Sequence, residues 1–449
     1  MAEDREVWTS KFGFILAATG SAVGLGNIWR FPYIAGTNGG AAFLILYLVG
    51  TVLIGYPILV AEMTIGRKTK KNPVGAFKKL ATNTNWWLVG ALGVLTGFIV
   101  LSYYSVIAGW ALSYVIKAAR GFESGMDFAQ LFNAHISGVR VPLFWHAIFM
   151  LLVIGTVRAG VVKGIQKIAE ILMPILLLIL LALVFRSVTL EGAAKGLSFY
   201  LAPDFTQVNA QTILDAIAQA FFTLSLGMGA IVTYGSYLSE KDGIVESANY
   251  ILVFDVVIAI LAGFVIFPAV FALGFDPATG PGLVFITLPA VFAEMPLGSL
   301  FGFLFFLLFT IAALTSAVSL LEVVVSYVVD EHAWSRKMAT KIVGSVIFLV
   351  GIPPLLGYSF FAEFTILGMN ILDLYDWLAN SIFLPLGGVL TAIFAAYIWG
   401  AKATIKEANK AAVGMKLGYV FAFLIKYLVP LAVIIVMISG VWQTIVGKL

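Results

Sequence analysis

Apolar residues fill most of this chain in long runs, which short polar segments separate. Each run is long enough to cross about 30 Å of hydrocarbon as a helix. The pattern predicts an all-α polytopic membrane protein with eleven transmembrane helices. The approximate bounds of the runs are 10–37, 41–67, 86–118, 142–158, 164–185, 212–239, 243–274, 297–329, 338–357, 366–400 and 412–446.

Two of these runs are interrupted by glycine. Residues 20–27 hold three glycines, and residues 223–229 hold Gly227 and Gly229. Glycine weakens a helix, and lipid tolerates no open backbone, so each break must face protein, water or an ion. Alternatively, the glycines could have a purely structural role and merely allow two helices to pack closely. Paired breaks in the two halves of a membrane chain favour a transporter's binding site instead.

Composition supports the membrane class and excludes several others. Hydrophobic residues make up 61% of the 449 residues and charged residues 11%, against about 25% charged in a soluble domain. Cysteine is absent, which excludes disulfides and thiol chemistry. The first ten residues lack the apolar core of a signal peptide, so the mature chain is expected to begin near Met1. In such a chain the basic residues report orientation rather than nucleic-acid binding.

The distribution of Lys and Arg predicts the topology. Most of the 27 fall in the N-terminal tail and the loops on its side of the membrane, which predicts a cytoplasmic N-terminus and an external C-terminus. The opposite side receives Lys117, Arg120, Arg140, Arg186, Lys195 and Lys448. No linker divides the chain, so residues 1–449 form one expected domain. Between the seventh and eighth runs, residues 280–282 precede a short apolar stretch, 283–292, that could form an outer lid.

The breaks offer ligands for two kinds of ion. A broken helix exposes carbonyl groups at one end and N–H groups at the other, which suit a cation and a carboxylate. Asn27 and Thr223 add neutral oxygens at the two breaks. Such ligands suit a monovalent cation better than calcium or zinc. No catalytic constellation is visible around the three histidines, so an enzyme is not expected.

Three segments carry a family resemblance: residues 24–32, 225–229 and 314–316. Together they resemble the neurotransmitter:sodium symporter family over essentially the whole chain. The resemblance implies the leucine-transporter fold, with discontinuous helices one and six. Two inverted five-helix repeats would cover about 10–185 and 212–400, and an accessory helix 412–446. Members with eleven helices are mostly bacterial, which implies a bacterial plasma membrane.

The resemblance also implies two sodium sites and a substrate pocket. The first sodium site takes the Ala22 carbonyl, Asn27, Thr223, Asp255 and the substrate carboxylate. The second takes the carbonyls of Gly20, Val23 and Ala312 and the hydroxyls of Thr315 and Ser316. Taken alone, the two hydroxyls could bond only to their own helix. The implied substrate pocket comprises Ser21, Ala22, Gly24, Gly26, Val100, Tyr104, Phe222, Thr223, Ser225, Leu226, Met228, Gly229 and Leu320.

Gates follow from the same resemblance. Arg30 and Asp376 form the expected outer gate. The expected inner gate sets Arg5 and Trp8 against Asp330, with Tyr237 nearby. Gly164 and Pro174 mark where helix five would unwind to admit water.

Two departures from related sequences refine the expected function. Animal monoamine carriers hold aspartate at the position of Gly24, so an amino acid that brings its own carboxylate is expected here. Asp255 stands where many relatives have asparagine, whereas chloride-independent relatives carry an acid at the position of Ala259. Asp255 is therefore expected to replace chloride, unless it is a structural acid paired with another helix.

The expected function is sodium-coupled import of neutral hydrophobic L-amino acids. Two alternatives stay open. The first is a narrow tryptophan or tyrosine carrier of the same family. The second is a transport-dead sensor or a ligand-gated channel. The expected partners are two sodium ions, an amino acid and the lipid bilayer, with no nucleic acid and no obligatory protein partner.

Overall fold

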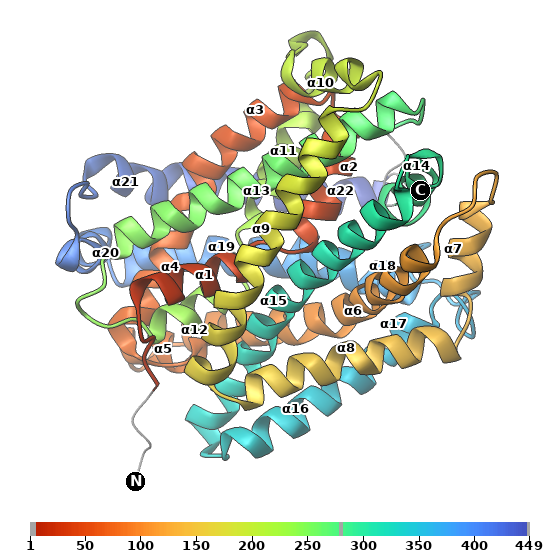
Figure 1. Cartoon of the computed structure of the whole chain (residues 1–449). Coiled ribbons are helices and arrows are strands. Elements are labelled where there is room, and N and C mark those ends of the chain that lie inside the picture. Colours follow the sequence, from red (N-terminus) through yellow and green to blue (C-terminus); the bar gives the residue numbers. More distant parts are fainter. Residues whose placement is uncertain (1–5, 278–281, 447–449) are drawn as a thin grey trace.

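The computed structural model describes residues 6–277 and 282–446, where regular structure is helical apart from one isolated bridge between Ile366 and Met369 (Figure 1). Helices satisfy their own backbone groups, as a hydrocarbon setting demands. Nine helices of this described part are long and apolar enough to span a membrane, or ten if the bent first pair is one span. The prediction of an all-α polytopic membrane protein is confirmed. The count of eleven stays a prediction, because the sixth expected span consists of two short helices.

The helices follow the predicted runs closely. The first five expected spans consist of α1 (Lys11–Ala22), η1 (Gly26–Arg30) and α2 (Phe31–Thr37); α3 (Ala41–Gly50), η2 (Thr51–Gly55) and α4 (Tyr56–Thr69); α6 (Trp87–Arg120); α8 (Arg140–Arg158); and η3 (Val161–Gln166) with α9 (Lys167–Val188). The next five consist of α11 (Ala210–Thr223) and α12 (Ala230–Ser236); α13 (Ile244–Ala272); α15 (Gly298–His332); α16 (Arg336–Val350) and α17 (Ile352–Leu356); and α18 (Ile371–Trp377), η6 (Leu378–Phe383), α19 (Leu384–Ile393) and η7 (Phe394–Ile398). The last consists of α21 (Tyr419–Phe423), η9 (Leu424–Leu428) and α22 (Val429–Val446).

Short helices form the connections between spans. They are α5 (Pro73–Leu80), α7 (Phe128–Ile136), α10 (Ala193–Leu201), η4 (Phe205–Gln207), η5 (Leu283–Thr287), α14 (Leu288–Glu294), α20 (Ala401–Ala408) and η8 (Asn409–Ala411).

Two predicted boundaries were wrong. The tenth span begins at Ile371 rather than 366, since Leu367 and Gly368 both have positive φ, which a helix cannot accommodate. The last span begins at Tyr419 rather than 412. There the chain turns at Gly414, where φ is +93°, and the helix starts only after Gly418.

Burial identifies the centre of the bundle. In an apolar 18-residue stretch of α15, 83% of the residues are buried. In the corresponding stretch of the span that contains α22, 22% are buried. The long helix α15 therefore forms the central scaffold (Figure 1), whereas low burial places the last span at the periphery.

The short apolar stretch after the seventh span forms one short helix, in which η5 continues directly into α14. Its Phe285 stacks on Phe132 at 5.2 Å between ring centroids and contacts Trp29 and Tyr114 edge-on. Aromatic contacts of this kind add to the burial energy. This short helix is therefore packed against α7 and α6, as an outer lid would be. Gly280 and Pro281, which the sequence placed at its start, lie outside the described residues.

Candidate substrate and ion site

The first span is broken between α1 and η1, where the two segments bend by 52°. Gly24 lies in this break, and a Cβ atom there would be 2.4 Å from Ser316 Oγ and 2.8 Å from the Tyr104 hydroxyl. Both contacts are too short to coexist with a Cβ atom, so any larger residue at this position would force the Ser316 and Tyr104 side chains to move. The break therefore brings backbone next to α15 and α6 side chains.

The break in the sixth span has a different local cause. Ser225, Gly227 and Gly229 all have positive φ, at 54°, 77° and 76°. This left-handed backbone cannot continue a right-handed helix. A Cβ at Gly227 would also lie 2.3 Å from the Leu384 carbonyl oxygen of α19. The two breaks meet, since Ser225 Oγ donates to the Ser21 carbonyl at 2.9 Å.

One oxygen cluster joins both breaks to α13. The Asp255 carboxylate accepts hydrogen bonds from Asn27 Nδ2 at 2.8 Å, Thr223 Oγ1 at 3.1 Å and the Tyr47 hydroxyl at 3.5 Å. All four residues are fully buried. The structure therefore brings together three of the four residues expected in the first sodium site. The fourth, Ala22, lines the adjacent cavity.

A second oxygen cluster joins the first break to α15. Ser316 Oγ lies 3.3 Å from the Gly20 carbonyl, 2.9 Å from that of Ser21 and 3.2 Å from that of Val23. Thr315 Oγ1 donates to the Ala312 carbonyl at 3.1 Å. All five residues expected in the second sodium site thus lie in this cluster or next to it. Ser316 bonds across to the broken helix, whereas the Thr315 hydroxyl bonds within its own helix.

A small cavity of about 30 Å³ lies between the two clusters. Tyr104 is part of its wall, and its hydroxyl accepts a hydrogen bond from the Leu25 N–H at 3.2 Å. The sequence predicted nine of its lining residues and missed Leu25 and Ser316. The nine are Ala22, Gly24, Gly26, Val100, Tyr104, Phe222, Ser225, Met228 and Leu320.

Four residues expected in the pocket do not line this cavity. Ser21 Oγ donates to Ser319 Oγ at 2.7 Å, and Thr223 faces Asp255. Leu226 is fully buried in the core, and a Cβ at Gly229 would meet Pro73 at 2.9 Å. These contacts come from other helices, so a pattern along the sequence does not predict them.

A larger vestibule of about 360 Å³ shares Leu25, Tyr104 and Phe222 with the small cavity. These three residues therefore form the boundary between the two spaces. Arg30 and Asp376 both line the vestibule, but the ion pairs of the described residues do not include this expected pair. The Arg30 guanidinium instead lies 4.7 Å from the centre of the Phe222 ring, and Asp376 accepts from Asn380 at 2.7 Å.

The opposite end of the site is closed by Trp8. Its indole N–H donates to the Tyr234 carbonyl at 3.0 Å, and its ring packs edge-on against Tyr237 at 5.9 Å. The expected inner-gate residues Trp8 and Tyr237 are therefore in contact. Asp330 accepts from the Asn72 N–H at 2.9 Å, and Arg5 lies outside the described residues.

The fifth span begins with a π-helical turn, η3, that contains Gly164. A Cβ at Gly164 would lie 2.0 Å from the Thr156 carbonyl oxygen, and Pro174 lies inside α9 without ending it. The N-terminal segment is bound to this turn, because Gln166 Nε2 donates to Thr9 Oγ1 at 2.5 Å and Glu6 accepts from the Val161 N–H. The expected unwinding segment thus starts in a non-α conformation.

Sequence reasoning missed two buried carboxylates. Glu62 of α4 accepts a hydrogen bond from the Gly227 N–H at 2.8 Å and supports the second break. Glu322 of α15 accepts from the Tyr237 hydroxyl at 2.5 Å and pairs with Arg336. Ionisable residues inside transmembrane segments indicate function, and this signal would have found both.

Comparison with known proteins agrees with this geometry. The family model described as "Sodium:neurotransmitter symporter family" matches residues 5–137 and 134–447. The chain is 42% identical to the uncharacterised sodium-dependent transporter YhdH of Bacillus subtilis over 98% of both chains. It is 34% identical to an uncharacterised sodium-dependent transporter of Haemophilus influenzae, over 98% of this chain and 99% of the relative.

A solved structure is also similar. The crystal structure of MhsT in complex with L-phenylalanine superposes with a TM-score of 0.90 at 46% identity, covering 97% of this chain and 100% of that one. The chain is a multi-pass membrane transporter with the leucine-transporter fold. It belongs to the sodium:neurotransmitter symporter family, a family of transporters and not of enzymes.

Proposed function

We propose that this protein couples two sodium ions to the import of a neutral hydrophobic L-amino acid, aliphatic or aromatic, without chloride. The observation that carries the proposal is the small cavity between the two oxygen clusters, at the point where both broken helices meet. A substrate in this cavity has the Tyr104 hydroxyl and broken-helix backbone beside it. These groups suit a carboxylate.

The donor sets favour sodium. Neutral carbonyl, hydroxyl and amide oxygens dominate both clusters, with Asp255 as the single carboxylate. Among the described residues no group of three or more His, Cys, Asp or Glu could hold a multivalent metal. Ala22, Asn27, Thr223 and Asp255 hold the first sodium ion in this proposal, and the second-cluster oxygens hold the other.

The apolar wall sets the substrate class. Val100, Phe222, Met228 and Leu320 offer no charge to a substrate side chain, and flexible methionine adapts to different shapes. The similar crystal structure of MhsT is a complex of that protein with L-phenylalanine. Two sodium ions entering at about 100 mV supply roughly 4.6 kcal/mol. That energy supports a concentration ratio of about three decades.

The proposed path runs from the larger vestibule past Phe222 to the cavity, and inward release requires Trp8 to leave Tyr234. The proposed location is a bacterial plasma membrane, with the N-terminus cytoplasmic and the C-terminus external. No obligatory protein partner is part of the proposal. One domain holds the whole site, built from two inverted repeats.

Proteoliposomes containing the purified chain test the proposal. An inward sodium gradient is expected to drive saturable accumulation of L-phenylalanine and L-leucine above the external concentration. Replacing sodium by potassium is expected to abolish this accumulation. Binding without accumulation would indicate a sensor, and downhill flux alone would indicate a channel. Competition by all the common amino acids separates the broad carrier from a narrow one, which only tryptophan and tyrosine would inhibit.

A further inference from the structure

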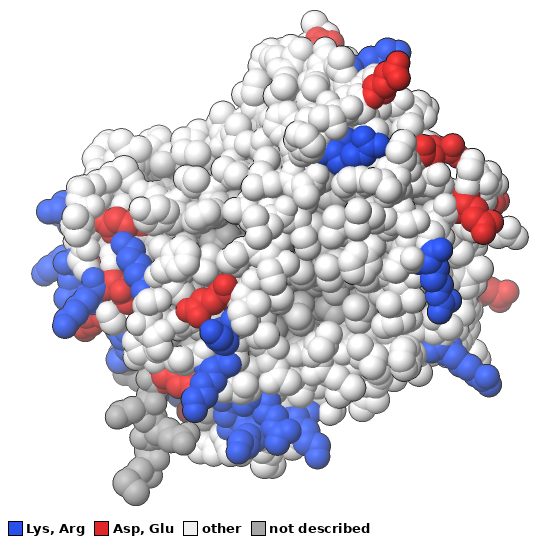
Figure 2. Space-filling model, in the orientation of Figure 1, with Lys and Arg blue, Asp and Glu red and all other residues white. Residues whose placement is uncertain are grey.

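The connection between the tenth and eleventh spans contains α20, a short helix with two unlike faces. Thr404, Glu407 and Ala408 are buried against the bundle. Lys402 and Lys406 are exposed and lie four residues apart, so they share one face. Lys410 continues this stripe one turn later in η8. Figure 2 shows Lys and Arg side chains gathered at the left edge of the molecule, where Figure 1 places α20 and α21.

Exposed apolar side chains follow the lysine stripe. Val413 is 83% exposed, Met415 56% and Tyr419 85%. The segment is nevertheless folded, because the Asn409 side chain makes two hydrogen bonds of 2.9 Å with the backbone of Leu417. Apolar side chains held in water on an ordered loop mark an interaction surface. This loop lies directly between two membrane-spanning segments, so lipid is its nearest apolar neighbour.

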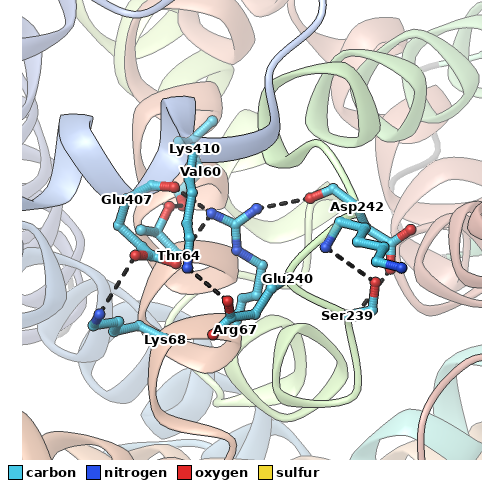
Figure 3. Close-up of polar contacts among 10 residues, drawn as sticks. Val60, Thr64, Arg67, Lys68, Ser239, Glu240, Asp242, Glu407 and Lys410 are labelled. Atoms are coloured by element: carbon cyan, nitrogen blue, oxygen red, sulfur yellow. Dashed lines mark hydrogen bonds and ion pairs between the residues drawn. The ribbon is translucent and has the colours of Figure 1, made fainter.

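Two carboxylates of this region are already in ion pairs (Figure 3), and a third, Glu246, accepts a hydrogen bond from the Val413 N–H. Glu407 faces inward to Arg67 at 3.1 Å, and Glu240 binds Lys410 at 2.6 Å. The hydrogen bond to Glu240 raises the pKa of Lys410, so this lysine stays charged. The ion pairs of the described residues include neither Lys402 nor Lys406. Lys402 and Lys406 therefore present unneutralised positive charge, whereas the charge of Lys410 is shared with Glu240.

We propose that this surface binds the headgroups of anionic phospholipids. The surface comprises Lys402, Lys406, Lys410 and Lys416 with Val413, Met415 and Tyr419, and we name it the α20 surface. The lysines contact lipid phosphate, and the apolar side chains enter the boundary between headgroups and acyl chains. A basic stripe beside exposed apolar residues is the arrangement by which segments bind an anionic membrane surface. A soluble polyanion would match the lysines but leave the apolar residues in water.

The α20 surface is connected to the transport machinery through its buried face. The Arg67 guanidinium, fully buried, donates to the Asp242 carbonyl at 2.7 Å and also binds Glu407 (Figure 3). Asp242 lies in the loop that follows α12, the helix against which Trp8 packs. A phosphate at Lys410 competes with Glu240 of the same loop. Lipid binding at Lys410 would therefore act on the loop that follows α12, and through α12 on the end of the site that Trp8 closes.

Native mass spectrometry of the purified, delipidated full chain tests the proposal with phosphatidylglycerol as the probe. The wild type is expected to bind added phosphatidylglycerol in preference to added phosphatidylcholine. Lys402→Gln with Lys406→Gln is expected to lower phosphatidylglycerol affinity about tenfold or more, since each lysine near an anionic surface contributes roughly a fivefold factor. The matched control is Lys337→Gln with Lys341→Gln on α16, two exposed lysines with the same spacing. An equal loss in both variants would overturn a defined site in favour of general charge attraction.

Two further arms identify the source of the anion. Val413→Ser with Met415→Ser changes no charge and is expected to weaken phosphatidylglycerol retention severalfold; unchanged retention would overturn the apolar contact. Excess inorganic phosphate is expected to leave the lipid bound, and full displacement would show that the surface recognises a free anion only. Gel filtration and melting temperature are first used to show that each variant is folded like the wild type. Because no arm uses substrate or sodium, failure here is distinct from failure of the proposed transport function.

Discussion

Asn27 donates its side-chain amide to the Asp255 carboxylate over 2.8 Å, and this bond joins the first broken helix to α13. Thr223 brings the second broken helix to the same carboxylate at 3.1 Å. A buried carboxylate costs several kcal/mol unless it is paired or bonded. Asp255 therefore fixes the positions of both breaks relative to α13, and sodium in the proposed first site would bind where three elements already converge.

The second oxygen cluster gives the first prediction. Thr315→Ala with Ser316→Ala is expected to raise the sodium concentration needed for half-maximal substrate binding by about tenfold or more, equivalent to about 1.4 kcal/mol. The reason is that the cluster loses both hydroxyl ligands of the proposed ion. Ser326→Ala is a matched control, because Ser326 lies on the same helix and bonds only to its own Val323 carbonyl at 3.0 Å. An unchanged sodium dependence in the double variant would remove both residues from the site.

Substrate recognition gives the second prediction. Tryptamine is expected to bind about 100-fold more weakly than L-tryptophan, since charge-assisted hydrogen bonds contribute about 1.5–3 kcal/mol each. The lost carboxylate is the group that the Tyr104 hydroxyl and the first break would receive. Competition against a labelled hydrophobic amino acid measures both affinities in one assay. Comparable affinities would favour a monoamine carrier, even though Gly24 offers no carboxylate.

Two ion pairs at the inner end give the third prediction. Arg67→Met is expected to destabilise the protein by about 3–5 kcal/mol, because Glu407 loses its fully buried partner and keeps only the more exposed Lys68 at 3.6 Å, and the Asp242 carbonyl loses its donor. Lys410→Gln breaks the exposed pair with Glu240, and no measurable loss is expected, because solvent already screens it. Melting temperatures in one detergent compare the two. Equal losses would contradict the role assigned to burial.

Local features of the sequence predicted the breaks and most span boundaries. Long apolar runs and clustered glycines act over a few residues, so residues 20–27 and 223–229 could be identified without tertiary contacts. Gly24 allows close packing against Ser316, and Gly227 combines close packing with a positive φ of 77°. The interruption of both helices was predicted, and the packing partners were not.

Partners across helices were harder to predict. Arg30 was expected against Asp376, and both line the vestibule, but the Arg30 guanidinium lies 4.7 Å from the centre of the Phe222 ring and Asp376 accepts from Asn380. Glu62 reaches the Gly227 N–H from another span. Such pairings depend on helix rotation and rotamers, which a sequence pattern does not specify. The residue-by-residue resemblance supplied the cavity wall, but it did not supply the direction of Ser21.

The last prediction is that transport does not require chloride, because Asp255 supplies the negative charge inside the membrane. Two sodium ions and a zwitterion carry net positive charge, which is expensive in a low-dielectric interior. Tyr47 and Thr223, where a chloride site would otherwise be sought, already donate to this carboxylate at 3.5 and 3.1 Å. Gln219, the third such residue, donates to the Gly26 carbonyl at 2.9 Å.

Replacing chloride by gluconate is therefore expected to leave the rate of sodium-driven uptake in proteoliposomes nearly unchanged. Asp255→Asn keeps the shape and most hydrogen bonds but removes the charge, and it is expected to lower sodium affinity about tenfold, with partial recovery when chloride is added. Glu62→Gln is the matched control, since it also neutralises a buried carboxylate at a helix break but lies away from the first cluster. A wild-type rate that collapses in gluconate would show that Asp255 is not the compensating anion, and the search for chloride would then return to Tyr47, Gln219 and Thr223.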